Sequence, residues 1–469
     1  MSRRTYITSS IPYVNAPPHL GHALELVEAD ALARQRRLRG DHVRFLTGTD
    51  ENALKNVRAA AAEGLPVAEL VGRNAARFQA LCDALDVSRD DFIRTSADPR
   101  HRPQVERLWL ACAAAGDLYQ REYEGLYCAG CEAFLDADRC SEHAEPLERV
   151  RERNWFFRLS RYEDDVAELL RRGRIRVEPP ERRAEALAFV RGGLADFSVS
   201  RTRERAGGWG IPVPGDPSQV VYVWFDALAN YVTADPEAWR AADERIHVIG
   251  KGILRFHAVY WPAILLSAGE PLPTAIFVHG YLTANGEKLS KSLGNALDPT
   301  RLVDRYGADA VRWWLLREAP LAGDADFREE LVVARANAEL ANGVGNLVHR
   351  TLGLVRTSPG TWYRALALSD ALAGEIDGAL KRFDFRRATS ALWALVADAN
   401  RYASEARPWA LRGAEREAAI GRLVAACNTL AEELEPFLPS GAARIRAALA
   451  SAGTAEPLFP RYLGTGSSL

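Results

Sequence analysis

The chain has 469 residues, of which 48% are hydrophobic and 26% charged, and its formal net charge at pH 7 is -2. This composition excludes a disordered chain and a strongly basic protein, so any binding of nucleic acid must use local basic surfaces. The length predicts two to four domains. No apolar run is long enough to span a bilayer, and the N-terminus MSRRTYITSS lacks the apolar stretch of a secretory signal. We therefore expect a cytoplasmic protein without a membrane partner.

The first predicted element is a strand–turn–helix unit. Tyr6-Ile7-Thr8 is a short extended run, a proline-rich turn follows, and His19-Leu20-Gly21-His22 leads into residues of helical spacing that end at Gly40. A helix N-terminus after a tight turn is a natural anion site, because its N–H groups and dipole face the ligand. From these residues alone, a phosphate site at His19 and His22 and an ordinary junction with two surface histidines remain equally possible.

A second predicted strand, Val43–Leu46, ends in the polar cluster Thr47-Gly48-Thr49-Asp50-Glu51. Ligands bind past the carboxyl ends of strands in open α/β sheets, so Asp50 is a candidate to receive an ammonium group. The alternative is that Asp50 caps the N-terminus of the helix that follows, and both roles are compatible. Residues 1–97 thus predict the first half of an α/β domain.

Residues 98–217 form a looser segment that contains a cluster of cysteines. Cys128-Ala129-Gly130-Cys131 is followed after eight residues by Cys140-Ser141-Glu142-His143. Three thiolates and one imidazole at this spacing suit tetrahedral Zn²⁺, and four protein ligands leave no open position, so we predict a structural site. The alternative, reduced cysteines beside an incidental histidine, is weaker because the intervening EAFLDADR offers little apolar core.

Residues 218–281 return to strands and apolar helices and predict the second half of the α/β domain. Past them lies a glycine-flanked loop, NGEKLSKSLGN, that contains Lys288 and Lys291. Only five of the 60 basic residues are lysines, so two lysines within four residues suggest a need for compact ammonium groups in a mobile loop that closes over an anion.

Residues 331–469 are rich in Ala, Leu, Arg and Glu with helical periodicity, which predicts a helical bundle. Asn346 and Arg350 are four residues apart and so share a helix face, and Pro408-Trp409 interrupts two helices. Taken alone, these residues would be a cap, a solvated charge and a packing aromatic.

Taken together, these motifs resemble the methionyl-tRNA synthetases, a family of class I aminoacyl-tRNA synthetases. His19-Leu20-Gly21-His22 matches the class I HIGH signature and Lys288-Leu289-Ser290-Lys291-Ser292 matches KMSKS. The methionyl assignment rests on IPYVNAPPHLGH, EYEGLYC before the zinc knuckle, NWFFRLSRY, WGIPVP, YVWFDALANY and FVHGYLTANGEKLSKSLGN. The resemblance runs from Tyr6 to about Tyr462.

The resemblance implies an α/β fold, in which a Rossmann-type parallel sheet is split by a zinc-knuckle connective insertion and followed by an all-α C-terminal helical bundle. We expect the domains to be 1–97 and 218–281 (the two halves of the catalytic domain), 98–217 (the insertion), 282–330 (the KMSKS-loop and stem-contact region) and 331–469 (the anticodon-binding domain). The implied activity is ATP-dependent activation of L-methionine and its transfer to tRNA(Met).

The resemblance also implies a role for each site residue. His19 and His22 would stabilise charge on the α-phosphate as the substrate carboxylate attacks ATP, while Lys288 and Lys291 would neutralise the β- and γ-phosphates, with Mg²⁺ accompanying ATP. The implied ATP-binding residues are His19, Gly21, His22, His279, Lys288, Ser290 and Lys291. The implied methionine-binding residues are Ile11, Tyr13, Asp50, Trp224, Tyr231 and His257. The implied anticodon readers are Asn346, Arg350 and Trp409, which would bind splayed bases by hydrogen bonds and stacking.

The chain departs from the family at several positions. Gly252 stands where the family has an aspartate that is expected to interact with a family arginine, matched here by Arg201, so Arg201 loses that carboxylate. Leu289 and Ile11 are mild, volume-conserving changes. No dimerisation module follows the bundle, so we expect a monomer. Gly252 leaves open a synthetase of another specificity, and a non-enzymatic tRNA-binding protein remains a third hypothesis, which the presence of His19, His22, Lys288 and Lys291 disfavours.

Overall fold

The computed structural model describes residues 2–128, 133–135, 138–140, 146–284, 286–288, 297–358, 370–451 and 457–463. The chain divides into two compact units. The first comprises Met1–Pro18, Gly40–Ala80 and Arg89–His279, and the second comprises His19–Arg39, Leu81–Ser88 and Gly280–Leu469.

The first unit is built on a six-stranded sheet in which every pair of neighbouring strands is parallel, in the order β3-β2-β1-β12-β13-β7. The strands are β1 (Arg4–Ser9), β2 (His42–Thr49), β3 (Asp91–Arg94), β7 (Arg176–Glu178), β12 (Glu244–Gly250) and β13 (Ala275–His279). The strand order changes direction between β1 and β12. In open α/β sheets, ligands bind outside the carboxyl ends of the strands at such a point.

The predicted strands at Tyr6–Thr8 and Val43–Leu46 are confirmed, and the second is longer than expected because it continues to Thr49. The central strands are buried along most of their length, as expected for a parallel sheet. Strand β7 comes from the region predicted as an insertion, yet it pairs with β13 and extends the sheet by one strand.

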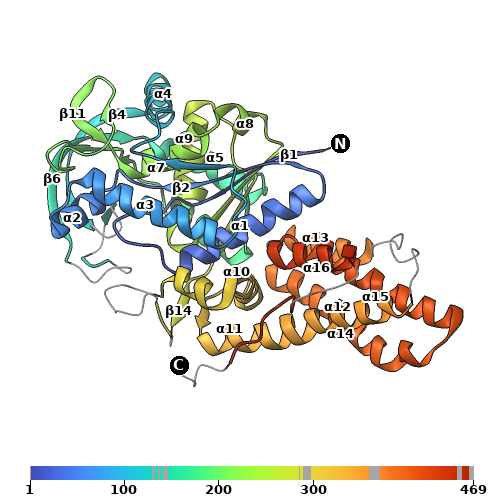
Figure 1. Cartoon of the computed structure of the whole chain (residues 1–469). Helices are drawn as coiled ribbons and strands as arrows, with labels where there is room; N and C mark the ends of the chain where they lie inside the picture. The colour runs from blue at the N-terminus through green and yellow to red at the C-terminus, as the bar shows by residue number, and fades with distance from the viewer. Residues whose placement is uncertain are drawn as a thin grey trace. The chain divides into compact units, whose positions relative to one another are not determined.

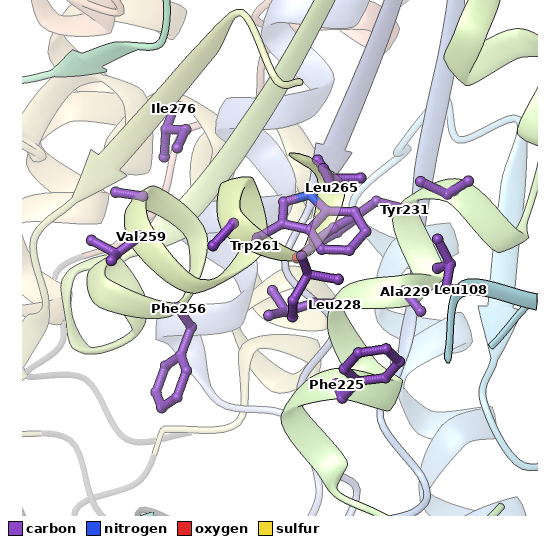
Figure 2. Close-up of a cluster of buried hydrophobic side chains, with 14 of the residues drawn as sticks. Leu108, Phe225, Leu228, Ala229, Tyr231, Phe256, Val259, Trp261, Leu265 and Ile276 are labelled. Atoms are coloured by element: carbon purple, nitrogen blue, oxygen red, sulfur yellow. The ribbon is translucent and has the colours of Figure 1, made fainter. Parts of the chain in front are cut away.

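Helices pack around this sheet and form the hydrophobic core of the first unit together with it. They are α2 (Leu54–Glu63), α3 (Val67–Ala84), α4 (His101–Ala114), α7 (Val223–Thr233), α8 (Pro236–Ala241) and α9 (Trp261–Ala268), with a 3₁₀ turn η2 (Lys251–Ile253) and a π-helical turn η3 (Phe256–Tyr260) before α9. Figure 2 shows side chains of α7, η3 and α9 gathered around Trp261, which is fully buried. These helices carry several of the predicted methionine-binding residues, so the pocket candidates lie on elements that contribute to the main hydrophobic core.

Two antiparallel sheets complete the first unit. One has the order β5-β4-β6-β8, with β4 (Leu118–Cys128), β5 (Ala133–Leu135), β6 (Glu148–Phe157) and β8 (Phe197–Ser198). The other has the order β10-β11-β9, with β9 (Ser200–Thr202), β10 (Pro212–Val213) and β11 (Asp216–Val221). The intervening helices are η1 (Leu159–Tyr162), α5 (Glu163–Arg171) and α6 (Pro180–Arg191).

The second unit is mainly helical, which confirms the predicted helical C-terminal region; Figure 1 shows its later helices in yellow to red. Its helices are α1 (Leu20–Leu38), α10 (Pro299–Glu318), α11 (Glu329–Arg335), η4 (Ala336–Gly345), α12 (Asn346–Arg356), α13 (Asp370–Leu380), α14 (Phe385–Ala406), η6 (Pro408–Ala410), α15 (Gly413–Glu433) and α16 (Pro439–Ser451). A small sheet contains β14 (Leu282–Ala284), β15 (Glu287–Lys288) and β16 (Ala325–Phe327).

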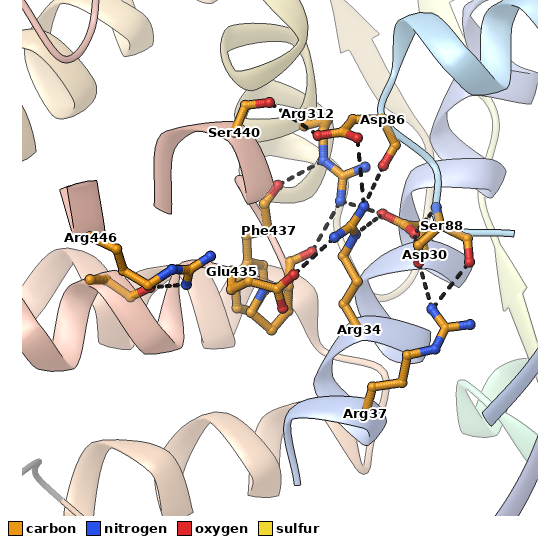
Figure 3. Close-up of polar contacts among 12 residues, drawn as sticks. Asp30, Arg34, Arg37, Asp86, Ser88, Arg312, Glu435, Phe437, Ser440 and Arg446 are labelled. Carbon is orange, nitrogen blue, oxygen red and sulfur yellow. Dashed lines mark hydrogen bonds and ion pairs between the residues drawn. The ribbon is translucent and has the colours of Figure 1, made fainter. Parts of the chain in front are cut away.

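Helix α1 is bound into the second unit by a buried polar network around Asp30 (Figure 3). The Asp30 carboxylate accepts hydrogen bonds from Arg34 and from the backbone and hydroxyl of Ser88, and it pairs with Arg312 of α10. Near the end of α1, Arg39 donates to Asp377 of α13 and to Glu433 of α15. The helix that begins at the signature histidines is therefore fastened to the bundle.

Among the helices of the described residues, none combines the length and the apolar character that crossing a membrane requires.

Candidate functional site

His19 and His22 form a compact pair at the start of α1. His19 is the N-cap residue, and its Nδ1 accepts a hydrogen bond from the backbone N–H of Gly21 at 3.1 Å. In return, Nδ1 of His22 accepts from the backbone N–H of His19 at 3.0 Å, and the two rings stack at 3.7 Å. Because both Nδ1 atoms are acceptors, each ring carries its N–H at Nε2, which makes Nε2 the donor that can meet an anion. The arrangement suits a phosphate oxygen near a helix N-terminus.

Gly21 makes this folded-back geometry possible. A Cβ atom at Gly21 would lie 3.0 Å from Cε1 and 3.1 Å from Nδ1 of His19. These distances are tighter than ordinary van der Waals contact, so a larger residue at this position would require the His19 ring to shift. The local reason for glycine is thus the ring of His19 itself.

Asp50 lies at the carboxyl end of β2, beside Tyr13. Its backbone N–H donates to the carbonyl of Pro12 at 2.9 Å, and Asp50 and Tyr13 form a parallel β-bridge. Asp50 is nearly completely buried. The alternative prediction that Asp50 caps the following helix is wrong, because α2 begins only at Leu54 and its N-cap is Ala53. Binding of an ammonium group by the Asp50 carboxylate stays a prediction.

Aromatic rings surround Trp224, which lies in the first turn of α7. Its indole stacks on Phe256 at 3.7 Å with the ring planes only 4° apart, and it meets Tyr13 edge-on at 6.3 Å. Ile11 and Trp224 both pack, half-buried, against the main hydrophobic core. Tyr13 and Trp224 also pack against the small cluster of Ala53, Tyr222 and Val223, so residues after β1, after β2 and on α7 are brought together within the first unit.

Tyr231 and His257 are joined by a hydrogen bond of 2.7 Å between the phenol oxygen and Nε2. Nδ1 of His257 lies 3.0 Å from the carbonyl of Ile253, which can only accept, so Nδ1 carries the ring proton and Nε2 accepts from Tyr231. His257 stands in the π-helical turn η3, a type of irregularity that is frequent at functional sites. The pair therefore presents a neutral, polarisable surface.

A third buried histidine, His247 of β12, packs against Tyr231 with ring centroids 4.3 Å apart. Burial is the main cause that lowers the pKa of His247 well below its ordinary value, with the neighbouring His257 ring as the second cause, so the His247 ring is neutral near pH 7. Its Nδ1 is 2.7 Å from the Thr8 hydroxyl. Sequence reasoning did not single out His247, although a histidine in the apolar run IHVIG is a detectable signal.

Sequence reasoning also missed a polar network at the base of α7. The Asp226 carboxylate is hydrogen-bonded to both His101 and Asn52, and Asp226 and His101 are fully buried. A carboxylate within the otherwise apolar VVYVWFDALANYV was the available signal.

Arg201 stands in β9, where the family arginine was expected. One Nη atom donates to the Ser198 hydroxyl at 2.9 Å and to the Ser200 carbonyl at 2.7 Å. Its guanidinium lies 4.1 Å from the ring centroid of Tyr222, a cation–π distance. Aromatic and neutral oxygen partners thus surround this arginine, and Gly252, in the turn η2, adds no carboxylate.

Parts of the predicted ATP and metal sites fall outside the described residues. Ser290 and Lys291 lie there, as do two of the four predicted zinc ligands, Cys131 and His143. The backbone of Lys288 pairs with Thr283, and His279 is the buried last residue of β13. Cys128 is the buried last residue of β4, and Cys140 is half-buried. Within the described part of the chain, no three His, Cys, Asp or Glu side chains are grouped to hold a metal ion.

The three predicted anticodon readers lie in the second unit. Asn346 is exposed at the start of α12, and Arg350 follows one turn later, as predicted. Trp409 in η6 is 52% exposed, and the Arg350 guanidinium lies 5.7 Å from its ring centroid. An exposed tryptophan beside an arginine is suited to stack an unpaired base.

Two family models match the chain. The model described as tRNA synthetases class I (M) matches residues 5–147 and 137–352, and the anticodon binding domain of methionyl tRNA ligase matches residues 365–460. The Methionine--tRNA ligase of Brucella suis biovar 1 is 44% identical over 439 residues, which cover 88% of this chain and 84% of that one. The corresponding protein of Mycobacterium tuberculosis (strain H37Rv) is 43% identical over 446 residues, 89% and 85% of the two chains.

Solved structures agree with these matches. Mycobacterium tuberculosis methionyl-tRNA synthetase in complex with methionyl-adenylate has a TM-score of 0.87 and 38% identity to this chain, covering 98% of it and 100% of the other. The apo form of that synthetase has a TM-score of 0.82 and 35% identity, with 99% of each chain covered. With family models that match most of its length and relatives above 40% identity, the chain belongs to the methionyl-tRNA synthetase family of class I tRNA synthetases.

Proposed function

We propose that this protein is a methionine–tRNA ligase that activates L-methionine with ATP and transfers it to tRNA(Met). The observation that carries the proposal is that one chain matches both the methionyl class of synthetases over residues 5–352 and the methionyl anticodon-binding domain over residues 365–460. Charging one tRNA with one amino acid requires a catalytic domain and an anticodon-binding domain of the same specificity.

In the first step, a methionine carboxylate oxygen attacks the α-phosphorus of ATP, the bond to the β-phosphate oxygen breaks, and pyrophosphate leaves. His19 and His22 would donate from Nε2 to the α-phosphate oxygens as charge develops, while Lys288 and Lys291 would neutralise the departing phosphates, with Mg²⁺ bound to ATP as substrate. Gly21, His279 and Ser290 would complete the ATP contacts. In this scheme, the residues act by position and charge and form no covalent intermediate.

Asp50 would bind the methionine ammonium group, and Ile11, Tyr13, Trp224, Tyr231 and His257 would surround the side chain. Support comes from the neutral Tyr231–His257 pair, since a thioether is a weak acceptor and is held by shape and soft contacts. Homocysteine is one methylene shorter than methionine, a difference worth only about 1–3 kcal/mol in a pocket. We therefore expect it to be misactivated and removed by cyclisation of its adenylate.

In the second step, the terminal ribose hydroxyl of the tRNA attacks the adenylate carbonyl and AMP leaves. Asn346, Arg350 and Trp409 would select the tRNA by reading its CAU anticodon. The exposed Trp409 with Arg350 at its face supports this role, because bases without a pairing partner stack on such surfaces.

We further propose one structural Zn²⁺ ion held by Cys128, Cys131, Cys140 and His143 in the connective insertion. The donor set of three thiolates and one imidazole fits tetrahedral zinc, and Cys128, the first residue of the first knuckle, is also the last residue of strand β4. Zinc would hold this loop together and take no part in catalysis. Metal analysis of the purified protein should find about one zinc per chain, and Cys128→Ser should lose it.

The domain boundaries, a monomeric state and a cytoplasmic location complete the proposal. Gel filtration with light scattering at working concentration should give a single mass near 51.7 kDa.

Aminoacylation tests the proposed function directly. Purified protein with methionine, ATP, Mg²⁺ and tRNA carrying a CAU anticodon should form methionyl-tRNA, and the same tRNA with an altered anticodon should be charged far more slowly. The absence of charging with any of the twenty amino acids would refute the proposal.

A further inference from the structure

Asp226 is a fully buried carboxylate on a helix whose other residues are mostly apolar. Its Oδ1 lies 2.5 Å from Nε2 of His101, and its Oδ2 accepts a hydrogen bond of 2.7 Å from the side-chain amide of Asn52. A buried carboxylate is costly unless it is paired and hydrogen-bonded, and here each oxygen has a partner from a different element. The network therefore has a defined geometry.

The Asn52 end of this network is fixed by its neighbours. The Glu51 N–H donates to the Thr95 hydroxyl at 2.9 Å, and the Glu51 carbonyl accepts from the Trp209 indole at 2.8 Å. The buried Glu51 carboxylate is itself bound by Arg94. Because the Glu51 backbone is held by Thr95 and Trp209, and its side chain by Arg94, the Asn52 amide meets Asp226 from a fixed position just after Asp50.

At the other end of the network, His101 is hydrogen-bonded to two residues of α7. His101 is the first residue of α4, and its Nδ1 lies 2.7 Å from the hydroxyl of Thr233, the last residue of α7. Asp226 and Thr233 are seven residues apart and so share one face of the helix. One imidazole thus contacts the first and the last turn of α7.

The predicted methionine contacts lie on the opposite face. Trp224 and Tyr231 are also seven residues apart, and at 100° per residue Asp226 follows Trp224 by about 200° around the helix. One side of α7 therefore carries the two aromatic pocket residues, while the other side carries the polar network. Any rotation or shift of α7 that the network prevents would move Trp224 and Tyr231 relative to Asp50.

We propose that Asn52, Asp226 and His101 are positioning residues that set the aromatic face of α7 against Asp50 and so define the fit of the amino acid. The proposal rests on the proposed function, because Asp50, Trp224 and Tyr231 are taken as the methionine contacts. None of the three positioning residues is assigned a contact with substrate. Their loss should weaken methionine binding selectively and leave ATP binding unchanged.

The test is methionine-dependent exchange of pyrophosphate into ATP, measured for Michaelis constants of both substrates. Asn52→Leu removes the amide donor at nearly constant volume. We expect its KM for methionine to rise roughly tenfold, as befits a lost hydrogen bond to a charged group, with the KM for ATP unchanged. Asn52→Asp should raise it further, because two carboxylates would then face each other.

The double variant Asn52→Asp with Asp226→Asn reverses the donor and the acceptor. It should bring the KM for methionine, raised in Asn52→Asp alone, most of the way back to the wild-type value. A general loss of stability would not produce such a rescue. Asn154→Leu is the matched control, since the buried Asn154 amide also donates to a carboxylate, that of Glu152 at 3.0 Å, but in strand β6. It should leave both Michaelis constants unchanged.

The outcomes separate the two proposals. If the wild-type protein shows no methionine-dependent exchange, the proposed function fails and the positioning proposal fails with it. If the wild type exchanges but Asn52→Leu keeps the wild-type methionine KM, or raises both Michaelis constants equally, only the positioning proposal is overturned. Failure of the reversed pair to recover methionine affinity would also overturn it.

Discussion

Arg312 and Asp30 form an ion pair that is entirely buried: Nη2 lies 2.7 Å from Oδ2, and neither side chain is exposed. Arg312 also donates to the carbonyls of Leu85, Pro436 and Phe437, so a single guanidinium joins α10 to two other backbone segments (Figure 3). Since α1 carries Asp30 about 15 Å from its first residue, Leu20, the pair anchors the helix that presents the signature histidines.

Arg312→Met should destabilise the protein by about 3–5 kcal/mol, because it removes one partner of a buried pair and leaves a carboxylate without its full compensation. Denaturant unfolding measures the change. Arg305→Met is the matched control, since Arg305 on the same helix makes an exposed ion pair with Glu329, and its loss should cost less than about 1 kcal/mol. Similar costs for both variants would show that burial does not govern the Arg312 pair.

The same pair predicts an acid-dependent stability. Burial would raise the pKa of Asp30, but Arg312, Arg34 and the hydrogen bonds from Ser88 outweigh it, so its pKa lies below the ordinary value. A lowered pKa means that this stabilisation is present above about pH 4, where the unfolded carboxyl is ionised, and is lost as pH falls through the folded pKa. Asp30→Asn should therefore have a flatter decline in unfolding free energy below about pH 4 than the wild type.

His247 predicts a second pH dependence, in a higher range. Its pKa is lowered by burial and by His257, so the unfolded chain takes up a proton at His247 before the folded chain does. Stability should thus be fully present above about pH 6.5 and should decrease as pH falls below it. His247→Gln should reduce this slope in thermal unfolding, with exposed His349→Gln as the control for the loss of one histidine. An unchanged slope in His247→Gln would contradict the buried neutral state.

Tyr231 and His257 should act as one unit in methionine binding. Their direct hydrogen bond of 2.7 Å means that Tyr231→Phe and His257→Ala each remove the same contact. In methionine-dependent pyrophosphate exchange, the double variant should therefore lose less than the sum of the single losses, with a coupling of at least about 0.5 kcal/mol. Additive losses would indicate that the two side chains contact the substrate independently.

Anticodon reading should be separable from amino-acid activation. Trp409→Ala should raise the KM for tRNA roughly tenfold, the effect of losing one stacked base, while methionine-dependent exchange without tRNA stays at the wild-type rate. Arg350→Gln should act in the same direction, and Arg356→Gln, an exposed arginine on the same helix, is its control. If Arg350→Gln and Arg356→Gln raised the KM for tRNA equally, Arg350 would contribute only nonspecific positive charge and no anticodon reading.

Local patterns in the sequence predict elements well and long-range pairings poorly. The helix after His19 and the helical repeat around Asn346 follow from apolar spacing within single segments, and the structure confirms both. The pairing of β1 with β12 joins residues such as Ile7 and Ile246, and no local pattern encodes such a partner.

The site shows the same division. Asp50 could be proposed from its place after a strand, whereas the bond between His101 and Asp226 joins positions 125 residues apart and depends on how α4 packs on α7. The exclusion of Asp50 as a helix cap also needed the structure, because only the backbone shows that α2 starts at Leu54. Sequence reasoning was thus most effective for residues within one motif.

The most direct test of the account is pyrophosphate exchange measured across the twenty amino acids and homocysteine. The account predicts rapid exchange with methionine, slower exchange with homocysteine, and exchange near background with the others. Faster exchange with a different amino acid, or none with methionine, would contradict it.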